Sequence, residues 1–339
     1  MARSYRMMAI VPLLRLPGPV MLDGMSENTM RAISQDVTGG PEVLKETELP
    51  RPEPGVGQIL IAVRAAGVNP TDWKHRADGL FVRTLPRVLG WDVSGVVVAV
   101  GIGVTLHKPG DEVFGMVPYP YGVGTHAEYV TGPARAFVPK PAALDHVQAG
   151  ALPLAALTAY QALVDTADVQ PGQRVLIHAA AGGVGHLAVQ IAKAKGAHVI
   201  GTASAAKHDF LRSLGADEVI DYRETDFAEA VGPVDVVLDT IGGATLSRSL
   251  DVVREGGTVV SILARSAPED TAKAAERGVR LALLIVEADQ AGMREIAALA
   301  ASGALRAHIA ATFPLEQAAK AHAMGETGRT QGKIVLEVK

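Results

Sequence analysis

A glycine-rich segment near the middle of the chain has the residue types and spacing of a phosphate-binding turn. Residues 180–185 read Ala-Ala-Gly-Gly-Val-Gly, between an apolar run and an amphipathic stretch. In that context, backbone N–H groups at a helix start can bind a pyrophosphate, helped by the helix dipole. Gly182 would let the backbone approach the ligand and Gly185 would let helix and strand pack closely, although Ala180 replaces the first glycine of the usual pattern. We expect a dinucleotide site rather than a plain tight turn, with contacts from Ala181, Gly182, Gly183 and Val184.

The residues after the next expected strand indicate which dinucleotide is bound. An NAD site usually has Asp or Glu about 20 residues after the turn, where it binds the ribose hydroxyls. Residues 201–207 read Gly-Thr-Ala-Ser-Ala-Ala-Lys and contain no acid. Ser204 and Lys207 instead offer a hydroxyl and a cation that suit a 2′-phosphate, and Tyr222 follows the third strand nearby. A lysine that merely lies at a helix N-terminus is slightly unfavourable, so we predict NADPH rather than NADH.

The composition excludes several other classes of function. The 339 residues carry a formal net charge of -4 and include no cysteine, which excludes disulfides, thiolate nucleophiles and iron–sulfur clusters. Without clustered Lys and Arg we expect no nucleic-acid partner, and without an apolar run of about 18 residues we expect no membrane span. The start of the chain faintly resembles a signal peptide, but Arg15 and several prolines interrupt its apolar run. We therefore expect residues 1–29 to be a loose extension and the protein to be cytoplasmic.

The first part of the chain has the pattern of an antiparallel β structure. From residue 30 to about 153, short apolar runs alternate with glycine and proline, which favours a barrel or sandwich. The expected strands are residues 59–63, 93–100, 112–117, 127–130 and 136–138. A helix is expected at residues 149–164.

The second part alternates strands with helices. Near-continuous apolar strands separated by helices predict a parallel sheet covered on both faces, as in a doubly wound nucleotide-binding domain. The expected strands are residues 174–178, 198–202, 218–220, 235–239, 258–262 and 281–286, with helices at 184–195 and 206–214. A helix at 289–303 and a strand at 333–338 follow. This tail is too short for a domain, so we expect it to return and complete the first one.

Three further segments, taken with the glycine turn, carry a resemblance to a known family. They read AAGVNPTDWK at residues 65–74, LGWDVSGVV at 89–97 and GTHAEYV at 124–130. Together they resemble the zinc-independent quinone oxidoreductase (ζ-crystallin-like) and alkenal or enoyl reductase branch of the medium-chain dehydrogenase/reductase superfamily. The resemblance implies an α/β protein with a GroES-like β-barrel catalytic domain at residues 30–153 and 289–339. A doubly wound Rossmann domain that binds NADPH would occupy residues 154–288.

The resemblance also implies a site without a metal. Zinc-dependent relatives have a cysteine and a Gly-His-Glu where this chain has Asn69 and the sequence Gly-Trp-Asp at residues 90–92. A catalytic zinc needs three N, S or O ligands, and the ten histidines are scattered, so we expect no metal. Without a Lewis acid a conjugated acceptor is easier to reduce than a ketone. Its negative charge spreads onto an oxygen that hydrogen-bond donors can stabilise.

Roles for individual residues follow from the same resemblance. Asn69 would lie near the nicotinamide and ribose, and Lys74 would be a donor beside the cofactor, which makes them the expected catalytic residues. Thr158 would contact the carboxamide side, and Ile262 would be a further cofactor contact. A solvent-facing loop lysine is the alternative for Lys74. We expect Asp72 to orient the loop rather than to transfer a proton.

The implied function is reduction of quinones or α,β-unsaturated carbonyl compounds by NADPH. Two alternatives stay open: an enoyl reductase that acts on carrier- or CoA-bound chains, and a non-catalytic NADPH-binding protein of the crystallin type. Tyr119 and Tyr121, in a loop rich in proline and glycine, are further candidate donors to the acceptor. A homodimer is also open, because residues 281–286 would suit either an edge strand that pairs across a dimer or an internal strand.

Overall fold

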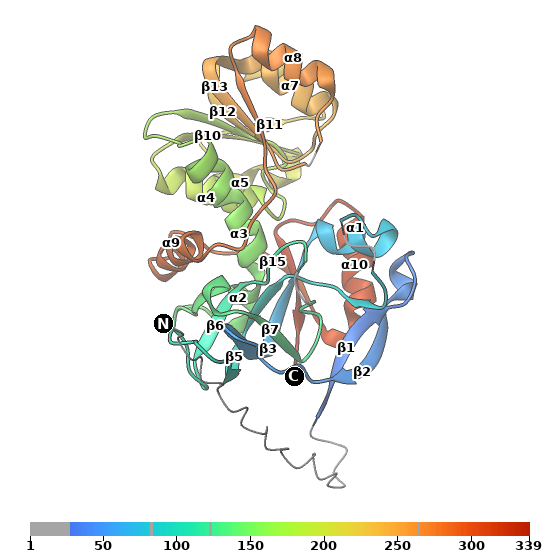
Figure 1. Cartoon of the computed structure of the whole chain (residues 1–339). Helices are drawn as coiled ribbons and strands as arrows, with labels where there is room; N and C mark the ends of the chain where they lie inside the picture. The colour runs from blue at the N-terminus through green and yellow to red at the C-terminus, as the bar shows by residue number, and fades with distance from the viewer. Residues whose placement is uncertain (1–27, 82–83, 122–123, 264) are drawn as a thin grey trace, which may run out of the picture.

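The computed structural model describes residues 28–81, 84–121, 124–263 and 265–339. Almost all of the expected loose extension, residues 1–27, lies outside the described residues. The first strand, β1 (Thr29–Gln35), begins one residue before the start that the sequence pattern suggested. The chain forms two lobes, which Figure 1 shows one above the other.

The first lobe, at the bottom of Figure 1, is built mainly from antiparallel strands. Besides β1, its strands are β2 (Lys45–Pro50), β3 (Gln58–Val68), β4 (Arg87–Val88), β5 (Asp92–Val100), β6 (Glu112–Met116), β7 (Tyr129–Pro133), β8 (Phe137–Pro139), β15 (Ile309–Pro314) and β16 (Lys333–Glu337). One sheet has the order β15-β16-β3-β5-β6-β8 with β7 also paired to β3, and a smaller sheet has the order β2-β1-β4. β16, at the end of the chain, pairs antiparallel with β3 of this lobe.

The second lobe contains a parallel six-stranded sheet. Its strands are β9 (Arg174–Ile177), β10 (His198–Ala203), β11 (Glu218–Asp221), β12 (Val234–Asp239), β13 (Val253–Ser261) and β14 (Arg280–Leu283). Their order is β11-β10-β9-β12-β13-β14, which is the doubly wound arrangement that the alternating pattern predicted. The sheet is covered on both faces, so central residues such as Val175 and Val237 are buried. All six strands fall between residues 154 and 288, and that domain division itself stays a prediction.

Helices connect and cover the sheets. The α-helices are α1 (Pro70–Asp78), α2 (His146–Ala151), α3 (Pro153–Tyr160), α4 (Gly185–Ala194), α5 (His208–Ser213), α6 (Phe227–Ala230), α7 (Ala244–Val252), α8 (Pro268–Glu276), α9 (Gln290–Ala301) and α10 (Ala318–Glu326). In Figure 1, α3 runs between the lobes and α9 lies beside it. None of the helices in the described part of the chain is long and apolar enough to cross a membrane.

The structure corrects several expected boundaries. The single helix expected at 149–164 is two helices, α2 and α3. Pro153 has no N–H to continue α2, and it begins α3 instead. A π-helical segment, Gln161–Thr166, follows α3. The strand expected at 281–286 is β14, which ends at Leu283, and the strand expected at 127–130 is β7, which is displaced toward Pro133. These elements were not identified in the sequence: β2, β4, β15, α1, α6, α7, α8 and α10.

Candidate active site

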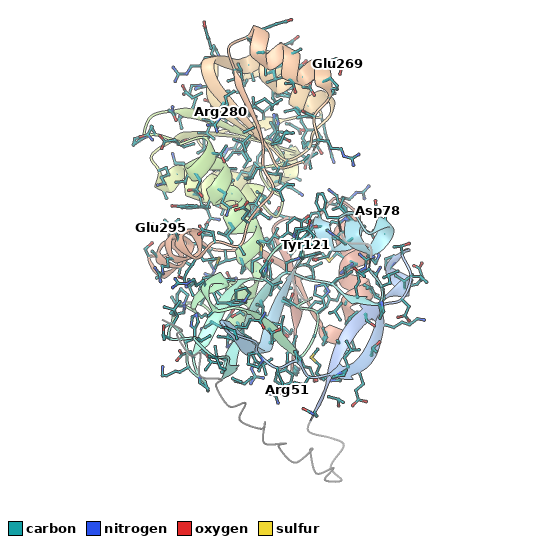
Figure 2. All side chains as sticks on the ribbon, in the orientation of Figure 1. Arg51, Asp78, Tyr121, Glu269, Arg280 and Glu295 are labelled. Carbon is teal, nitrogen blue, oxygen red and sulfur yellow. The ribbon has the colours of Figure 1, made fainter. Side chains whose placement is uncertain are left out.

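Two adjoining hollows lie between the lobes. The first hollow, of about 230 Å³, is bordered by α1, Tyr119 and residues 284–286. The second hollow, of about 320 Å³, is bordered by the glycine turn and residues 325–334. They share lining residues, among them Asn69, Val184 and Ile262, and so form one cleft. Figure 2 labels Asp78 and Tyr121 on the end of the first lobe that faces the second lobe.

The glycine turn joins β9 to α4 at the second hollow. Gly185 begins α4, where a Cβ would overlap the carbonyl oxygen of Ala179, so only glycine permits this packing. Gly182 and Gly183 line the hollow, and a Cβ at Gly183 would meet nothing closer than 3.6 Å. The turn that leads into α4 is therefore open to a ligand, as a bound pyrophosphate requires. Ala181 is buried and does not line either hollow.

Asn69 lies immediately before α1 and is held from three directions. Its backbone N–H donates to Asp72 Oδ2 at 2.6 Å, which is one half of a capping box, so Asp72 orients this turn. Its Nδ2 donates to Asp92 Oδ2 at 2.9 Å, and its Oδ1 accepts a hydrogen bond from Lys333 Nζ. A lysine can only donate and a carboxylate can only accept, so these partners determine which way the amide faces. Asn69 also lines both hollows of the cleft.

Lys333 and Asp92 form a buried ion pair behind Asn69. Lys333 begins β16, is 2% exposed, and places Nζ 3.5 Å from Asp92 Oδ2 and 3.2 Å from the Val68 carbonyl oxygen. Asp92 begins β5, and its Oδ1 accepts from the N–H of Leu154 in the first turn of α3 at 2.6 Å. Burial raises the pKa of the Asp92 carboxyl, and the Lys333 ammonium acts against that rise.

The neighbouring carboxyl of Asp72 is fully buried as well. Burial raises the pKa of Asp72 to about 8, and the nearby Asp92 carboxylate contributes to the rise. Of the two buried carboxyls, Asp92 is the one that the Lys333 ammonium contacts. The pair ties the first residues of β5 and β16 to the start of α3, and all three elements border Asn69.

Three further predicted residues lie on the cleft. Thr158 Oγ1 donates to the Leu154 carbonyl at 2.7 Å, so its lone pairs remain able to accept from an amide N–H, as a carboxamide contact requires. Ile262 follows β13 and lines both hollows, while Lys74 is exposed and lines the first. The cleft thus brings together these predicted residues: Asn69, Lys74, Thr158, Gly182, Gly183, Val184 and Ile262.

The predicted phosphate contacts lie beside the cleft and do not line either hollow. Ser204 and Lys207 follow β10 and Tyr222 follows β11, and these two strands are neighbours in the sheet. Lys207 Nζ donates to the Arg329 carbonyl oxygen at 3.1 Å. Arg329 belongs to the segment 325–332, which lines the second hollow. Lys207 is therefore close to the segment that lines the second hollow, while Ser204 and Tyr222 follow adjacent strands of the same sheet.

Sequence reasoning missed Lys333, and it treated Asp92 only as part of a motif. One signal was present, because Lys333 stands at the start of an apolar strand where a charge is unusual.

At the expected zinc-ligand position, Trp91 is buried with its ring against Tyr119, at a centroid distance of 5.2 Å. Within the described residues, no group of three or more His, Asp or Glu is placed to hold a metal ion. A metal-free enzyme stays a prediction.

The doubly wound sheet, the open glycine turn and the facing Asn69 define a class: an oxidoreductase that uses a nicotinamide cofactor in a cleft between two lobes. Comparison with known families agrees. The alcohol dehydrogenase GroES-like domain matches residues 55–142, and the family described as zinc-binding dehydrogenase matches residues 214–336. The chain belongs to the medium-chain dehydrogenase/reductase family, with the GroES-like and Rossmann architecture that its sequence resembled.

Individual relatives extend over most of the chain. A 2-haloacrylate reductase from a Burkholderia species is 37% identical over 88% of this chain and 96% of its own length. A chloroplastic NADPH-dependent alkenal/one oxidoreductase from Arabidopsis thaliana is 36% identical over 94% of this chain and 82% of its own length. The solved structure of the quinone oxidoreductase from Coxiella burnetii is 40% identical, with a TM-score of 0.87 over 92% of this chain and 100% of that chain.

Proposed function

We propose that this protein is an NADPH-dependent reductase that needs no zinc and transfers hydride to quinones or α,β-unsaturated carbonyl compounds. The observation that carries the proposal is the single cleft in which the glycine turn of one lobe faces Asn69 and Lys74 of the other. The names of the relatives support this class of acceptor. A small apolar acceptor is favoured by these lining residues of the first hollow: Leu80, Phe81, Leu263, Leu284, Ile285 and Val286.

The residues of the cleft fit a nicotinamide cofactor. The turn that leads into α4 would bring its backbone close to a pyrophosphate, because Gly182 and Gly183 leave the approach open. Thr158 would accept from the carboxamide, and Ile262 would give the ring an apolar contact. When bound, the cofactor supplies the hydride. The role of the protein is to hold donor and acceptor in line and to exclude water from between them.

Charge must be stabilised at the acceptor oxygen as hydride adds to the conjugated carbon. Lys74, which lines the first hollow, and the second amide N–H of Asn69 are the proposed donors. One such preorganised donor contributes about 3 kcal/mol in the transition state. Hydrogen bonds polarise a saturated ketone less than a Lewis acid would, so simple ketones should be poor substrates.

The preference for NADPH rests on three side chains at one corner of the second lobe: Ser204, Lys207 and Tyr222. Lys207 also contacts the backbone of the 325–332 segment, at the Arg329 carbonyl oxygen. Asp221 is also present there, and an acid would disfavour a phosphate. Its two oxygens accept hydrogen bonds from the backbone N–H groups of Ala205 and Arg223, each at 2.9 Å, and these bonds lower its pKa. Asp221 therefore stays a carboxylate, and the cation of Lys207 has to offset its charge.

The substitution Lys207→Ala tests this preference. Loss of a charge-assisted phosphate contact costs roughly 1.5–3 kcal/mol, so the Kd for NADPH should rise about ten- to a hundredfold while the Kd for NADH stays nearly constant. Lys195→Ala is the matched control, because it removes the same charge from an exposed lysine at the far end of α4. Calorimetric titration with both cofactors measures the four constants. Equal losses for NADPH and NADH would mean that Lys207 only supports the 325–332 segment.

A screen of NADPH oxidation tests the reaction itself. Quinones, enals and enones should be reduced, and saturated ketones should be reduced much more slowly. Activity confined to enoyl thioesters would favour a reductase of carrier- or CoA-bound chains, and tight NADPH binding without any turnover would favour a non-catalytic protein.

A cytoplasmic homodimer is proposed alongside the reaction. The support for the dimer is that β14 forms one edge of its sheet, and that Leu283 and Ile285 are exposed beside that edge. Light scattering coupled to size exclusion measures the mass in solution. A mass of one chain would contradict the dimer.

A further inference from the structure

Three side chains form a hydrogen-bonded row in the wall of the first hollow. Tyr119 Oη lies 3.0 Å from Thr71 Oγ1, and Thr71 Oγ1 lies 3.1 Å from His75 Nδ1. Thr71 and His75 are one turn apart on α1, whereas Tyr119 comes from the loop after β6. Thr71 and Tyr119 both line the hollow, next to Lys74. The row therefore ends on a phenol hydroxyl at the place proposed for the acceptor.

The proton positions along this row follow from one backbone contact. His75 Nδ1 lies 2.8 Å from the Thr71 carbonyl oxygen, which can only accept, so Nδ1 carries the ring proton. A protonated Nδ1 has no lone pair for the Thr71 hydroxyl, which leaves Tyr119 Oη as its acceptor. The O–H of Tyr119 is then not used by Thr71 and remains available to a molecule in the hollow.

The surroundings keep Tyr119 in place and protonated. Its ring meets those of His75 and Trp91 edge-on, at centroid distances of 6.0 and 5.2 Å. Burial raises the pKa of Tyr119, and the hydrogen bond from Thr71 acts against that rise, so the phenol holds its proton at neutral pH yet is stabilised once it loses it. Burial lowers the pKa of His75, so the ring is neutral. Tyr121, by contrast, is 80% exposed and does not line the hollow.

We propose that Tyr119 is the general acid that protonates the α-carbon of a reduced enone or enal, with Thr71 and His75 as positioning residues. The proposal rests on the proposed function. Hydride adds to the β-carbon and leaves an enolate. The O–H bond of Tyr119 then breaks, its proton forms the new C–H bond at the α-carbon, and its electron pair stays on Oη, which Thr71 stabilises. Water restores the phenol proton, because Tyr119 is only half-buried. A quinone needs no such acid, since its reduced oxygens take protons from water.

The test compares two acceptors, α-methylcyclohexenone and p-benzoquinone, with NADPH as reductant. In Tyr119→Phe the kcat for the enone should fall about a hundredfold, which is the usual contribution of a general acid, while the kcat for the quinone should stay within about threefold. The stereochemistry of the product gives an independent readout. Wild type should form one enantiomer of the α-methyl ketone, and the variant should form a mixture, because the enolate is then protonated from either face.

Two further variants separate catalysis from structure. Tyr121→Phe removes the same hydroxyl from the exposed neighbour and should leave both acceptors unaffected. Thr71→Val keeps the phenol but removes the bond to it, and should slow the enone about tenfold; Thr71→Ser should restore the rate. Unchanged enone kinetics and stereochemistry in Tyr119→Phe would overturn the proposal, as would equal losses for both acceptors. If wild type reduced neither compound, the proposed function itself would fail.

Discussion

Lys333→Met should destabilise the protein strongly, and the loss should depend on pH. Methionine has nearly the length of lysine, so it removes the ammonium while it fills most of the same space. Asp92 would then be a fully buried carboxylate with only the N–H groups of Asn69 and Leu154 as partners, at 2.9 and 2.6 Å. Removal of one partner from a buried ion pair costs about 3–5 kcal/mol, because the other charge stays buried without compensation.

The pH dependence follows from the direction of the pKa shift. Burial already raises the pKa of Asp92, and loss of Lys333 removes the main opposing influence. An acid whose pKa is higher in the folded protein than in the unfolded chain loses stability as pH rises through that range. Lys333→Met should therefore cost less near pH 5, where Asp92 can take up a proton, than near pH 8.

Thermal unfolding followed by circular dichroism measures the effect. At about 2 °C per kcal/mol for a chain of this size, the Tm should fall by roughly 6–10 °C at pH 8. The double variant Lys333→Met with Asp92→Asn removes both charges and should recover most of that loss. An equal loss at pH 5 and pH 8, together with no recovery in the double variant, would refute the ion-pair reasoning and point to simple loss of packing in β16.

Three shorter predictions address the turn, the donor and the metal. Gly185→Ala should lower the free energy of unfolding by about 2 kcal/mol or more and weaken NADPH binding, because the new Cβ overlaps the Ala179 carbonyl oxygen. Thermal unfolding measures the first effect and titration with NADPH measures the second. Unchanged values would contradict the close packing at Gly185. Lys74→Met should lower kcat for enones about a hundredfold while NADPH affinity survives; a raised Kd with normal kcat would instead indicate cofactor anchoring. Elemental analysis should find no zinc and chelators should not reduce activity, whereas one zinc per chain with chelator-sensitive activity would contradict a metal-free site.

The sequence predicts best those parts of the fold that local pattern determines. Near-continuous apolar runs such as 174–178 and 235–239 identify parallel strands because both of their faces are covered. The glycine turn is recognisable because Gly185 satisfies a steric requirement that no other residue meets. The boundary inside 149–164 is harder, since Pro153 suits the first turn of a helix as well as an interruption, and only packing decides between one helix and two.

The local sequence pattern also cannot decide between Tyr119 and Tyr121 as the donor, for a different reason. The two tyrosines are separated by one residue in a loop without a regular period. The sequence therefore does not indicate which side chain is buried or in which direction either one points. The structure separates them through Thr71 on α1, which holds the Tyr119 hydroxyl in the wall of the first hollow. A contact between residues 48 positions apart in the chain requires the tertiary fold.

Lys333 was not predicted because the residue pattern of its strand does not indicate which side chains point into the core. In a half-buried strand, alternation would place Lys333 with Val335 and Glu337 on one face and Ile334 on the other. In β16, however, Lys333, Ile334, Val335 and Leu336 are all buried, since this strand is packed on both faces. A lysine before such a run looks like a solvated strand end. Its burial depends on the register that pairs Ile334 with Val68, which brings Lys333 beside Asn69 from 264 residues away. That register is a tertiary property, so the residue that orients Asn69 becomes identifiable only once β16 is paired with β3.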